Sequence, residues 1–242
     1  MGETVEFPSN GHTCGGYLAT PTSGRGPGVV VIQEYWGVNA HVRDLCDRFA
    51  AEGFVALAPD LYHGKETKEP DEAGKLLMEL DLAEAARDML GAGKWLAASD
   101  RTAGDRVGIV GFCMGGALAI YAATLSDVFA AVVPFYPYMG VTAAAKPDVT
   151  RIKGAVLGHF AEKDGAYTHE QIEELERELR GADIDVEFFW YSGADHAFFN
   201  DTRPEVFDPD AARLAWDRTR AFFRTHLATT VAPGLRHMRW PV

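Results

Sequence analysis

The segment Val107–Gly116 contains a cysteine whose neighbours could make it a nucleophile. It has the sequence Val-Gly-Ile-Val-Gly-Phe-Cys-Met-Gly-Gly, so Cys113 lies between Gly111 and Gly115. A Gly-x-nucleophile-x-Gly pattern between a strand and a helix is typical of the nucleophile elbow, here with cysteine in the place more often held by serine. So sharp a turn pushes its central residue toward positive φ, and flanking glycines leave the room it needs. The pattern predicts that Cys113 attacks an electrophilic carbon.

The helix expected after Cys113 would stabilise a thiolate. Its free N–H groups and positive dipole end would face the sulfur and, later, an oxyanion. The backbone N–H of Met114 is the natural first oxyanion donor. Most free cysteines are small buried apolar residues, and we interpret Cys14 and Cys46 in that way because they lack the elbow pattern.

Two further residues follow strands later in the chain, in the order acid and then histidine. Asp164 lies in a loop after the apolar run 155–159, and His196 lies in a loop after the strand that ends at Tyr191. Because the carboxyl ends of parallel strands share one edge of a sheet, we expect both side chains near Cys113. Cys113 would attack, His196 would move the proton and Asp164 would orient the imidazole.

Other candidates for these two roles are weaker. Glu162 competes with Asp164 as the acid, but the glycine after Asp164 suits a turn. Asp195 is adjacent to His196, and neighbouring side chains in a tight loop diverge. His159 is either a packing residue or a support for the site. No zinc site is expected, since no two histidines lie three to five residues apart with a third ligand nearby.

The elements that must position these residues alternate between short apolar runs and longer amphipathic segments. Such alternation predicts an α/β fold with a mostly parallel sheet covered by helices on both faces, which with the elbow is the α/β-hydrolase fold. We assign residues 1–227 to a single domain and 228–242 to a tail without periodicity. The expected strands are 28–33, 54–58, 106–110, 130–135, 154–158 and 185–191, the last near a sheet edge. The expected helices are about 39–52, 76–98, 115–124, 168–180 and 209–226, with a surface loop at 62–71.

Composition excludes several classes of protein. With 242 residues, 47% hydrophobic and 24% charged, the chain has ordinary globular composition. A net charge of −12 without a basic cluster argues against a nucleic-acid partner. No apolar run approaches the roughly 20 residues of a membrane-spanning helix, and the first residues lack the features of a secretory signal. Three widely spaced cysteines fit a reducing compartment. We therefore expect a cytoplasmic enzyme with no membrane partner.

Glu34 adds a fourth candidate. It follows the apolar strand 28–33, and a carboxylate there is unfavourable unless it is paired. Taken alone, Glu34 would be interpreted as a cap or ion-pair partner of the next helix. Together with the elbow it completes a set that resembles the dienelactone hydrolase family (carboxymethylenebutenolidases). The residues that carry this resemblance are Gln33-Glu34-x-x-Gly37-x-Asn39, Ala58-Pro-Asp-Leu-Tyr62, Gly111-Phe-Cys-Met-Gly-Gly116, Asp164 and Tyr191-x-Gly-Ala-x-His196-x-Phe198.

The resemblance implies an acyl transfer. Cys113, His196 and Asp164 would be the triad, and Glu34 would take the thiol proton when substrate arrives. The N–H of Tyr35 would join that of Met114 in the oxyanion hole. The thiolate would open a lactone, and water would hydrolyse the thioester; no cofactor or metal is implied. Candidate substrate-binding residues are Trp36, Phe198 and Arg203.

The chain departs from the family in its arginines. Characterised members hold a substrate carboxylate with two arginines, one of them four residues after the histidine, where this chain has Asn200. Either Arg203, Lys75 or Arg87 replaces them, or the substrate is not the small anionic dienelactone. The first expectation is hydrolysis of a dienelactone-type unsaturated lactone, and the second is a broader carboxylesterase activity. A third, of another class, is a non-catalytic binding or redox-sensing protein that uses Cys113.

Overall fold

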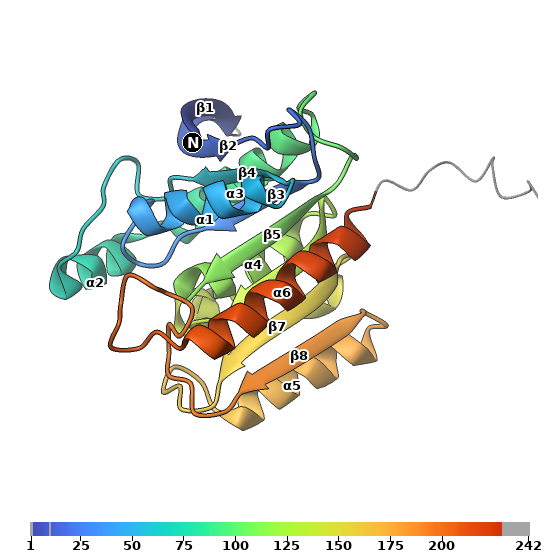
Figure 1. Ribbon diagram of the computed structural model, residues 1–242. Helices are drawn as coiled ribbons and strands as arrows, with labels where there is room; N and C mark the ends of the chain where they lie inside the picture. Colours follow the sequence, from blue (N-terminus) through green and yellow to red (C-terminus); the bar gives the residue numbers. More distant parts are fainter. Residues whose placement is uncertain (1, 10, 229–242) are drawn as a thin grey trace, which may run out of the picture.

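A sheet of eight strands forms the middle layer of the molecule (Figure 1). The computed structural model describes residues 2–9 and 11–228, so the tail expected at 228–242 lies outside the described residues after Ala228. The strands lie in the order β1-β2-β4-β3-β5-β6-β7-β8, and from β4 to β8 every neighbouring pair is parallel. The mostly parallel sheet is therefore confirmed. The strands are β1 (Glu3–Ser9), β2 (His12–Ala19), β3 (Gly28–Ile32), β4 (Val55–Pro59), β5 (Val107–Phe112), β6 (Phe129–Phe135), β7 (Ala155–Ala161) and β8 (Val186–Tyr191).

Helices cover both faces of the sheet (Figure 1). On one face α1 packs on β2, β3 and β4, and α6 packs on β6 and β7. On the other face α3 and α4 pack on the central strands, and α5 packs on β8. The helices are α1 (Ala40–Ala51), α2 (Pro70–Glu79), α3 (Leu82–Ala97), α4 (Met114–Leu125), α5 (His169–Gly181) and α6 (Pro209–His226), with short 3₁₀ segments η1 (Met139–Ala145) and η2 (Val149–Arg151).

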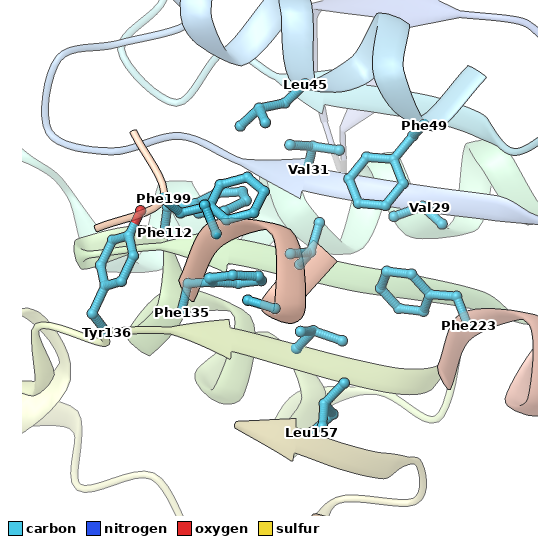
Figure 2. Packing of buried hydrophobic residues seen from close by; sticks show 14 of the residues in the cluster. Val29, Val31, Leu45, Phe49, Phe112, Phe135, Tyr136, Leu157, Phe199 and Phe223 are labelled. Carbon is cyan, nitrogen blue, oxygen red and sulfur yellow. The ribbon is translucent and has the colours of Figure 1, made fainter. Parts of the chain in front are cut away.

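The central strands are buried on both faces, as their unbroken apolar runs predict. Successive side chains of a strand point to opposite faces. In β3, Val29 and Val31 pack into the core under α1 and α6, where Phe49 and Phe223 meet them (Figure 2), whereas Val30 belongs to the core under α3 and α4. Burial on both faces fixes the position of each strand within the sheet. It therefore also fixes the position of the loop that follows its carboxyl end.

The first two strands form an antiparallel hairpin for which the sequence patterns gave no prediction. β1 pairs with β2 in a register that joins Glu3 to Leu18 and Ser9 to His12, and β2 pairs antiparallel with β4. β1 is an edge strand with mostly exposed side chains, so its alternation is weak. At the opposite edge, β8 confirms the edge position expected for 185–191.

The prediction of one helix over 76–98 is wrong. Two helices occupy this region, α2 and α3, and the chain breaks between them at Leu80 and Asp81. Asp81 caps α3 by accepting hydrogen bonds from the N–H groups of Ala83 and Glu84 at 2.8 and 3.0 Å. Such a cap satisfies N–H groups that have no partner at a helix N-terminus, so it starts a new helix there. Because of this break, α2 does not continue the axis of α3.

Candidate active site

Cys113 lies on the sharp turn between β5 and α4. Its backbone has φ 54° and ψ −119°, so the positive φ expected of an elbow is present. The turn is held from both sides: the Cys113 N–H donates to the carbonyl of Phe135 at 3.1 Å, and the Cys113 carbonyl accepts from Tyr138 at 2.9 Å. A strained non-glycine residue persists only where its surroundings determine its backbone. The neighbouring strand β6 and its following loop supply that restraint.

The two glycines of the elbow are required by close backbone approach. A Cβ atom at Gly111 would overlap the carbonyl oxygen of Gly115, and one at Gly115 would overlap the carbonyl oxygen of Gln33. Both obstacles are backbone atoms, so no side-chain rearrangement relieves them. The glycines therefore leave the room that the sharp turn needs, as the sequence pattern predicts, and Gly115 also lets α4 approach the end of β3.

His196 and Asp164 form a short pair. The two atoms Nδ1 of His196 and Oδ2 of Asp164 lie 2.7 Å apart, and the Asp164 side chain is fully buried. Its second oxygen accepts from the N–H of Ala166 at 2.8 Å, which fixes the carboxylate plane. Both residues lie in loops that follow strands, β7 for Asp164 and β8 for His196. The convergence of the strand ends therefore brings the expected acid to the expected histidine.

The environment of His196 favours its protonated form. Burial lowers the pKa of this imidazole, but the hydrogen bond to Asp164 and the interaction with Cys113 outweigh burial and raise the pKa to about 10. The ring lies edge-on to Tyr136, with 5.1 Å between centroids. At neutral pH the group in this site is thus an imidazolium beside a sulfur.

The competing candidates have other roles. Glu162 accepts from the Ser192 hydroxyl and the Gly193 N–H, both at 2.8 Å, and ties the β8 loop to the β7 loop. Asp195 is exposed. His159 is fully buried, with its ring nitrogens 2.8 Å from the Tyr191 hydroxyl and 2.9 Å from that of Thr219. Burial lowers its pKa well below the usual value, so His159 is a neutral packing residue between β7, β8 and α6.

Glu34 lies at the end of β3 with only 3% of its surface exposed. Its carboxylate accepts from the Asn200 side-chain amide at 2.8 Å and from the Tyr136 hydroxyl at 3.3 Å. The Asn200 oxygen in turn accepts from the N–H and the hydroxyl of Thr202, which fixes the direction of the amide. The position that departs from the family pattern therefore supplies a neutral partner to the buried carboxylate, in place of an arginine.

A cavity of about 260 Å³ opens above the elbow. Its lining includes the ionisable side chains of Glu34, Cys113, His196 and Arg203. It also includes Trp36, Leu77, Tyr138 and Ala197, which contribute mostly apolar surface. Tyr35 also borders the cavity, and within 2–9 and 11–228 neither its N–H nor that of Met114 donates to another protein group. The two N–H groups expected to bind an oxyanion are thus uncommitted.

The structure separates the expected substrate-binding residues. Trp36 and Arg203 border the cavity, with the Arg203 guanidinium carbon 6.0 Å from the Trp36 ring centroid. Phe198 does not border it; this side chain is fully buried against Tyr136 and Tyr191. The backbone turn at Ala197, with φ 66°, directs Phe198 into the core, so its assignment to substrate binding is wrong.

Two other basic residues considered as replacements for the family arginines lie elsewhere. Lys75 is exposed on α2, and Arg87 borders a separate cavity with Pro8 and Trp95. Arg203 is the one of the three that reaches the cavity above Cys113, and its Nε donates to Glu205 at 2.9 Å.

Sequence reasoning missed several residues of this site. Tyr136, Tyr138 and Leu77 drew no attention, and Asn200 was noted as a departure and not as a partner of Glu34. Tyr136 and Tyr138 follow the end of β6, which is the same position relative to a strand that identified Asp164 and His196. That positional signal could have found the two tyrosines. Leu77 carried no such signal because α2 was merged with α3.

Two structural findings bear on other classes of function. In the described part of the chain, no group of three or more His, Cys, Asp or Glu side chains is arranged to hold a metal ion. No helix among residues 2–9 and 11–228 is both long enough and apolar enough to span a bilayer.

Comparison with known proteins places this geometry in a family. The model of the dienelactone hydrolase family matches residues 14–227. Protein usf of Aquifex pyrophilus is 41% identical over 236 residues, covering 94% of this chain and all of that protein. A protein of Aquifex aeolicus, provisionally named a carboxymethylenebutenolidase, is 36% identical over 94% of this chain and all of its own length.

The structural comparison agrees. The crystal structure of a Klebsiella pneumoniae protein, provisionally described as a dienelactone hydrolase, superposes with a TM-score of 0.82 at 30% identity, covering 92% of this chain and 98% of that one. The elbow, the parallel sheet and the sequence match over most of the chain lead to one conclusion: the protein has the α/β-hydrolase fold, belongs to the dienelactone hydrolase family and is a hydrolase that acts on esters.

Proposed function

We propose that this protein hydrolyses a carboxylic ester or lactone by attack of the Cys113 thiolate, through a thioester. One observation carries the proposal. Cys113 lies at φ 54° on the elbow, and in the same cavity His196 is paired with Asp164 at 2.7 Å. A nucleophile beside an imidazole that is itself oriented by an acid is the arrangement that acyl transfer requires.

The resemblance to the family and its place in the cavity make Glu34 the acceptor of the first proton. The hydrogen bond to Asp164 and the interaction with Cys113 raise the pKa of His196 to about 10, so the imidazole is protonated once the thiolate has formed beside it. Glu34 is a carboxylate that lines the same cavity. We therefore assign the thiol proton of Cys113 to Glu34, and the resulting thiolate is stabilised by the imidazolium and by the N-terminus of α4.

The thiolate then attacks the carbonyl carbon. The N–H groups of Met114 and Tyr35 bind the oxyanion of the tetrahedral intermediate. When the intermediate collapses, the C–O bond of the ester breaks, and the imidazolium of His196 gives its proton to the leaving oxygen. The acyl group remains on Cys113 as a thioester, and His196 is now neutral.

Neutral His196 completes the cycle as a base. It takes a proton from water as the water attacks the thioester, and the second intermediate releases the carboxylic acid and the Cys113 thiolate. The thiolate recovers its proton from Glu34. Each step uses side chains and N–H groups of this chain together with water, and the starting protonation states are restored.

The first-choice substrate is a dienelactone-type unsaturated lactone, as formed in aromatic-compound degradation, and Arg203 is the residue we assign to its carboxylate. Family membership and the position of Arg203 in the cavity support this choice. The second candidate is a broader carboxylesterase, which Asn200 favours because it places a neutral amide where an arginine would bind an anion. The three free cysteines of the described chain suit a reducing, cytoplasmic setting.

Turnover of p-nitrophenyl acetate tests the reaction. Wild type should hydrolyse it, and Cys113→Ala and His196→Ala should not. Rapid quenching followed by intact mass measurement should find acetate on wild type and none on Cys113→Ala. If ester turnover is absent while peroxide modifies Cys113 stoichiometrically, the enzyme proposal fails and the redox-sensor alternative gains.

A substrate pair tests the substrate class. A dienelactone and a neutral lactone of the same ring size are compared with wild type and Arg203→Ala. A preference for the anionic lactone that disappears in Arg203→Ala supports the first choice. Equal kcat/KM for both lactones in both proteins overturns it in favour of the carboxylesterase.

A further inference from the structure

The lining of the cavity above Cys113 contains two chemically different sets of residues. Glu34, His196 and Arg203 are ionisable. Trp36, Leu77 and Tyr138 form an apolar lining, and they come from three separate segments of the chain: the loop after β3, helix α2 and the loop after β6. The mechanism proposed above uses the ionisable residues and leaves the apolar lining without a role.

Leu77 reaches the cavity from a helix that lies at the periphery. Figure 1 shows α2 beyond the carboxyl ends of the parallel strands, away from the two helical layers. One stripe of α2 faces the body: Ala73 is fully buried, and Leu76 and Leu77 pack against buried residues under α3 and α4. This spacing of three and four residues is that of an amphipathic helix. The neighbouring Met78 points away, with 87% of its surface exposed.

The charge distribution determines what the apolar lining can accept. Arg203, the basic residue of the cavity, lies 6.0 Å from the Trp36 ring centroid and donates to Glu205. A charged group placed against the aliphatic side chain of Leu77 would lose water without gaining a partner from that side chain, which is unfavourable. An apolar group placed there would leave water and contact aromatic and aliphatic carbon, which is favourable in proportion to the area covered.

We propose that Leu77, together with Trp36 and Tyr138, binds an uncharged apolar group that flanks the ester bond, which makes Leu77 of α2 a specificity-determining residue. This inference rests on the hydrolysis proposed above, and it adds that the group in contact with Leu77 is apolar. The carbon atoms of a lactone ring and an alkyl chain both meet this requirement for an apolar group.

Two series of esters test this role. In one, p-nitrophenyl acetate, butyrate and hexanoate lengthen the acyl side; in the other, acetate esters of ethanol, butanol and hexanol lengthen the alcohol side. In wild type, kcat/KM should rise in at least one series by about threefold to fourfold for each methylene group that reaches the subsite, from the transfer free energy of a methylene. In Leu77→Ala, kcat/KM should rise by less than about twofold for each methylene group. The kcat/KM for the shortest ester of that series should change little.

Met78→Ala is the matched control, because it removes a similar side chain from the adjacent, solvent-facing position of the same helix. It should keep the wild-type dependence on chain length, and Leu77→Met, which preserves volume, should restore it. Alanine is also a good helix former, so α2 should survive both truncations. A flattened dependence specific to Leu77→Ala supports the subsite.

Equal length dependence in Leu77→Ala and Met78→Ala, in both series, overturns it. Failure of the underlying reaction would look different, because wild type would then hydrolyse no ester of either series, or hydrolysis would persist in Cys113→Ala whatever the ester length.

Discussion

Replacement of Asp164 by asparagine is the sharpest test of the site. The change keeps the shape of a fully buried side chain whose Oδ2 lies 2.7 Å from Nδ1 of His196. It replaces an acceptor by an amide that can turn its N–H groups toward the ring. Nδ1 would then accept instead of donate, and the neutral ring would carry its proton on Nε2. The imidazolium would lose its main ionic partner.

The size of the effect can be worked from the pKa of His196. The difference between its usual value of 6.5 and about 10 corresponds to roughly 5 kcal/mol in favour of the imidazolium, at about 1.4 kcal/mol per pH unit. Asp164 and Cys113 share this stabilisation, so we assign roughly half of it to Asp164. Because burial by itself lowers this pKa, the pKa of His196 in Asp164→Asn should fall from about 10 into the pH range of the assay. A loss of roughly 2–3 kcal/mol predicts a fall in kcat/KM of about 10²-fold.

Initial rates with p-nitrophenyl acetate between about pH 6 and pH 9 measure the fall in kcat/KM caused by Asp164→Asn. Glu162→Gln is the matched control. Glu162 lies two residues from Asp164, but it bonds Ser192 and Gly193 at the surface and should leave kcat/KM within about twofold. If Asp164→Asn keeps kcat/KM within about threefold of wild type across this pH range, or if Glu162→Gln loses as much, the assignment of the acid is wrong.

Three further predictions concern the same site. Glu34→Gln should lower kcat/KM by about 10²–10⁴-fold, as loss of a general base does, and slow the alkylation of Cys113 by iodoacetamide, followed by intact mass. Asn200→Ala should lower the free energy of unfolding by about 1.5–3 kcal/mol in a urea titration, because it removes a hydrogen bond to a buried carboxylate; Asp195→Asn, an exposed position, serves as the control and should change it little. Because the pKa of His196 is raised from 6.5 to about 10 in the folded protein, its contribution to stability is fully present below pH 6.5 and is lost as the pH rises through about 10. The Tm difference between wild type and His196→Gln should therefore narrow over that range in calorimetry, and a constant difference would contradict the assigned pKa.

The parts of the site that sequence alone could predict are those fixed by local backbone constraints. The glycines around Cys113 are required by overlaps with backbone oxygen atoms. The constraint on Gly111 comes from Gly115 within the elbow, and the constraint on Gly115 comes from Gln33 at the end of the neighbouring strand β3. Asp164 and His196 were predictable for a related reason. Each lies in a loop after an apolar run, and the loops after parallel strands gather at one edge of the sheet.

The residues that sequence reasoning missed or misassigned depend on contacts between distant segments. Asn200 and Glu34 are 166 residues apart, and their hydrogen bond becomes visible only when β3 and the loop after β8 lie side by side. Phe198 was assigned to the substrate because it lies two residues after His196. The backbone at Ala197 has φ 66°, which turns the following side chain into the core. No periodicity in the sequence indicated that turn.

The misjudged helix boundary had the largest consequence for function. The segment Leu-Leu-Met-Glu-Leu-Asp-Leu-Ala-Glu continues a helical pattern through Asp81, and aspartate has a weak enough effect inside a helix that composition alone does not break it. The cap formed by Asp81 decides the break. α2 is a separate helix after this break, and its residue Leu77 borders the cavity above Cys113.

The proposed reaction and the proposed specificity therefore have different structural origins in this protein. The reacting groups lie at or after the ends of β3, β5, β7 and β8. The positions of these strands in the sheet are set by the packing of helices on both faces. The apolar lining of the cavity includes Leu77 of α2. A short break separates this helix from α3, and one stripe of small and aliphatic side chains packs it against the body. Changes in α2 can alter which group flanks the ester without disturbing the strand ends. If Leu77→Ala changed the rate with the smallest ester as strongly as with the longest, this separation would be wrong, because the helix would then be acting on the reacting groups themselves.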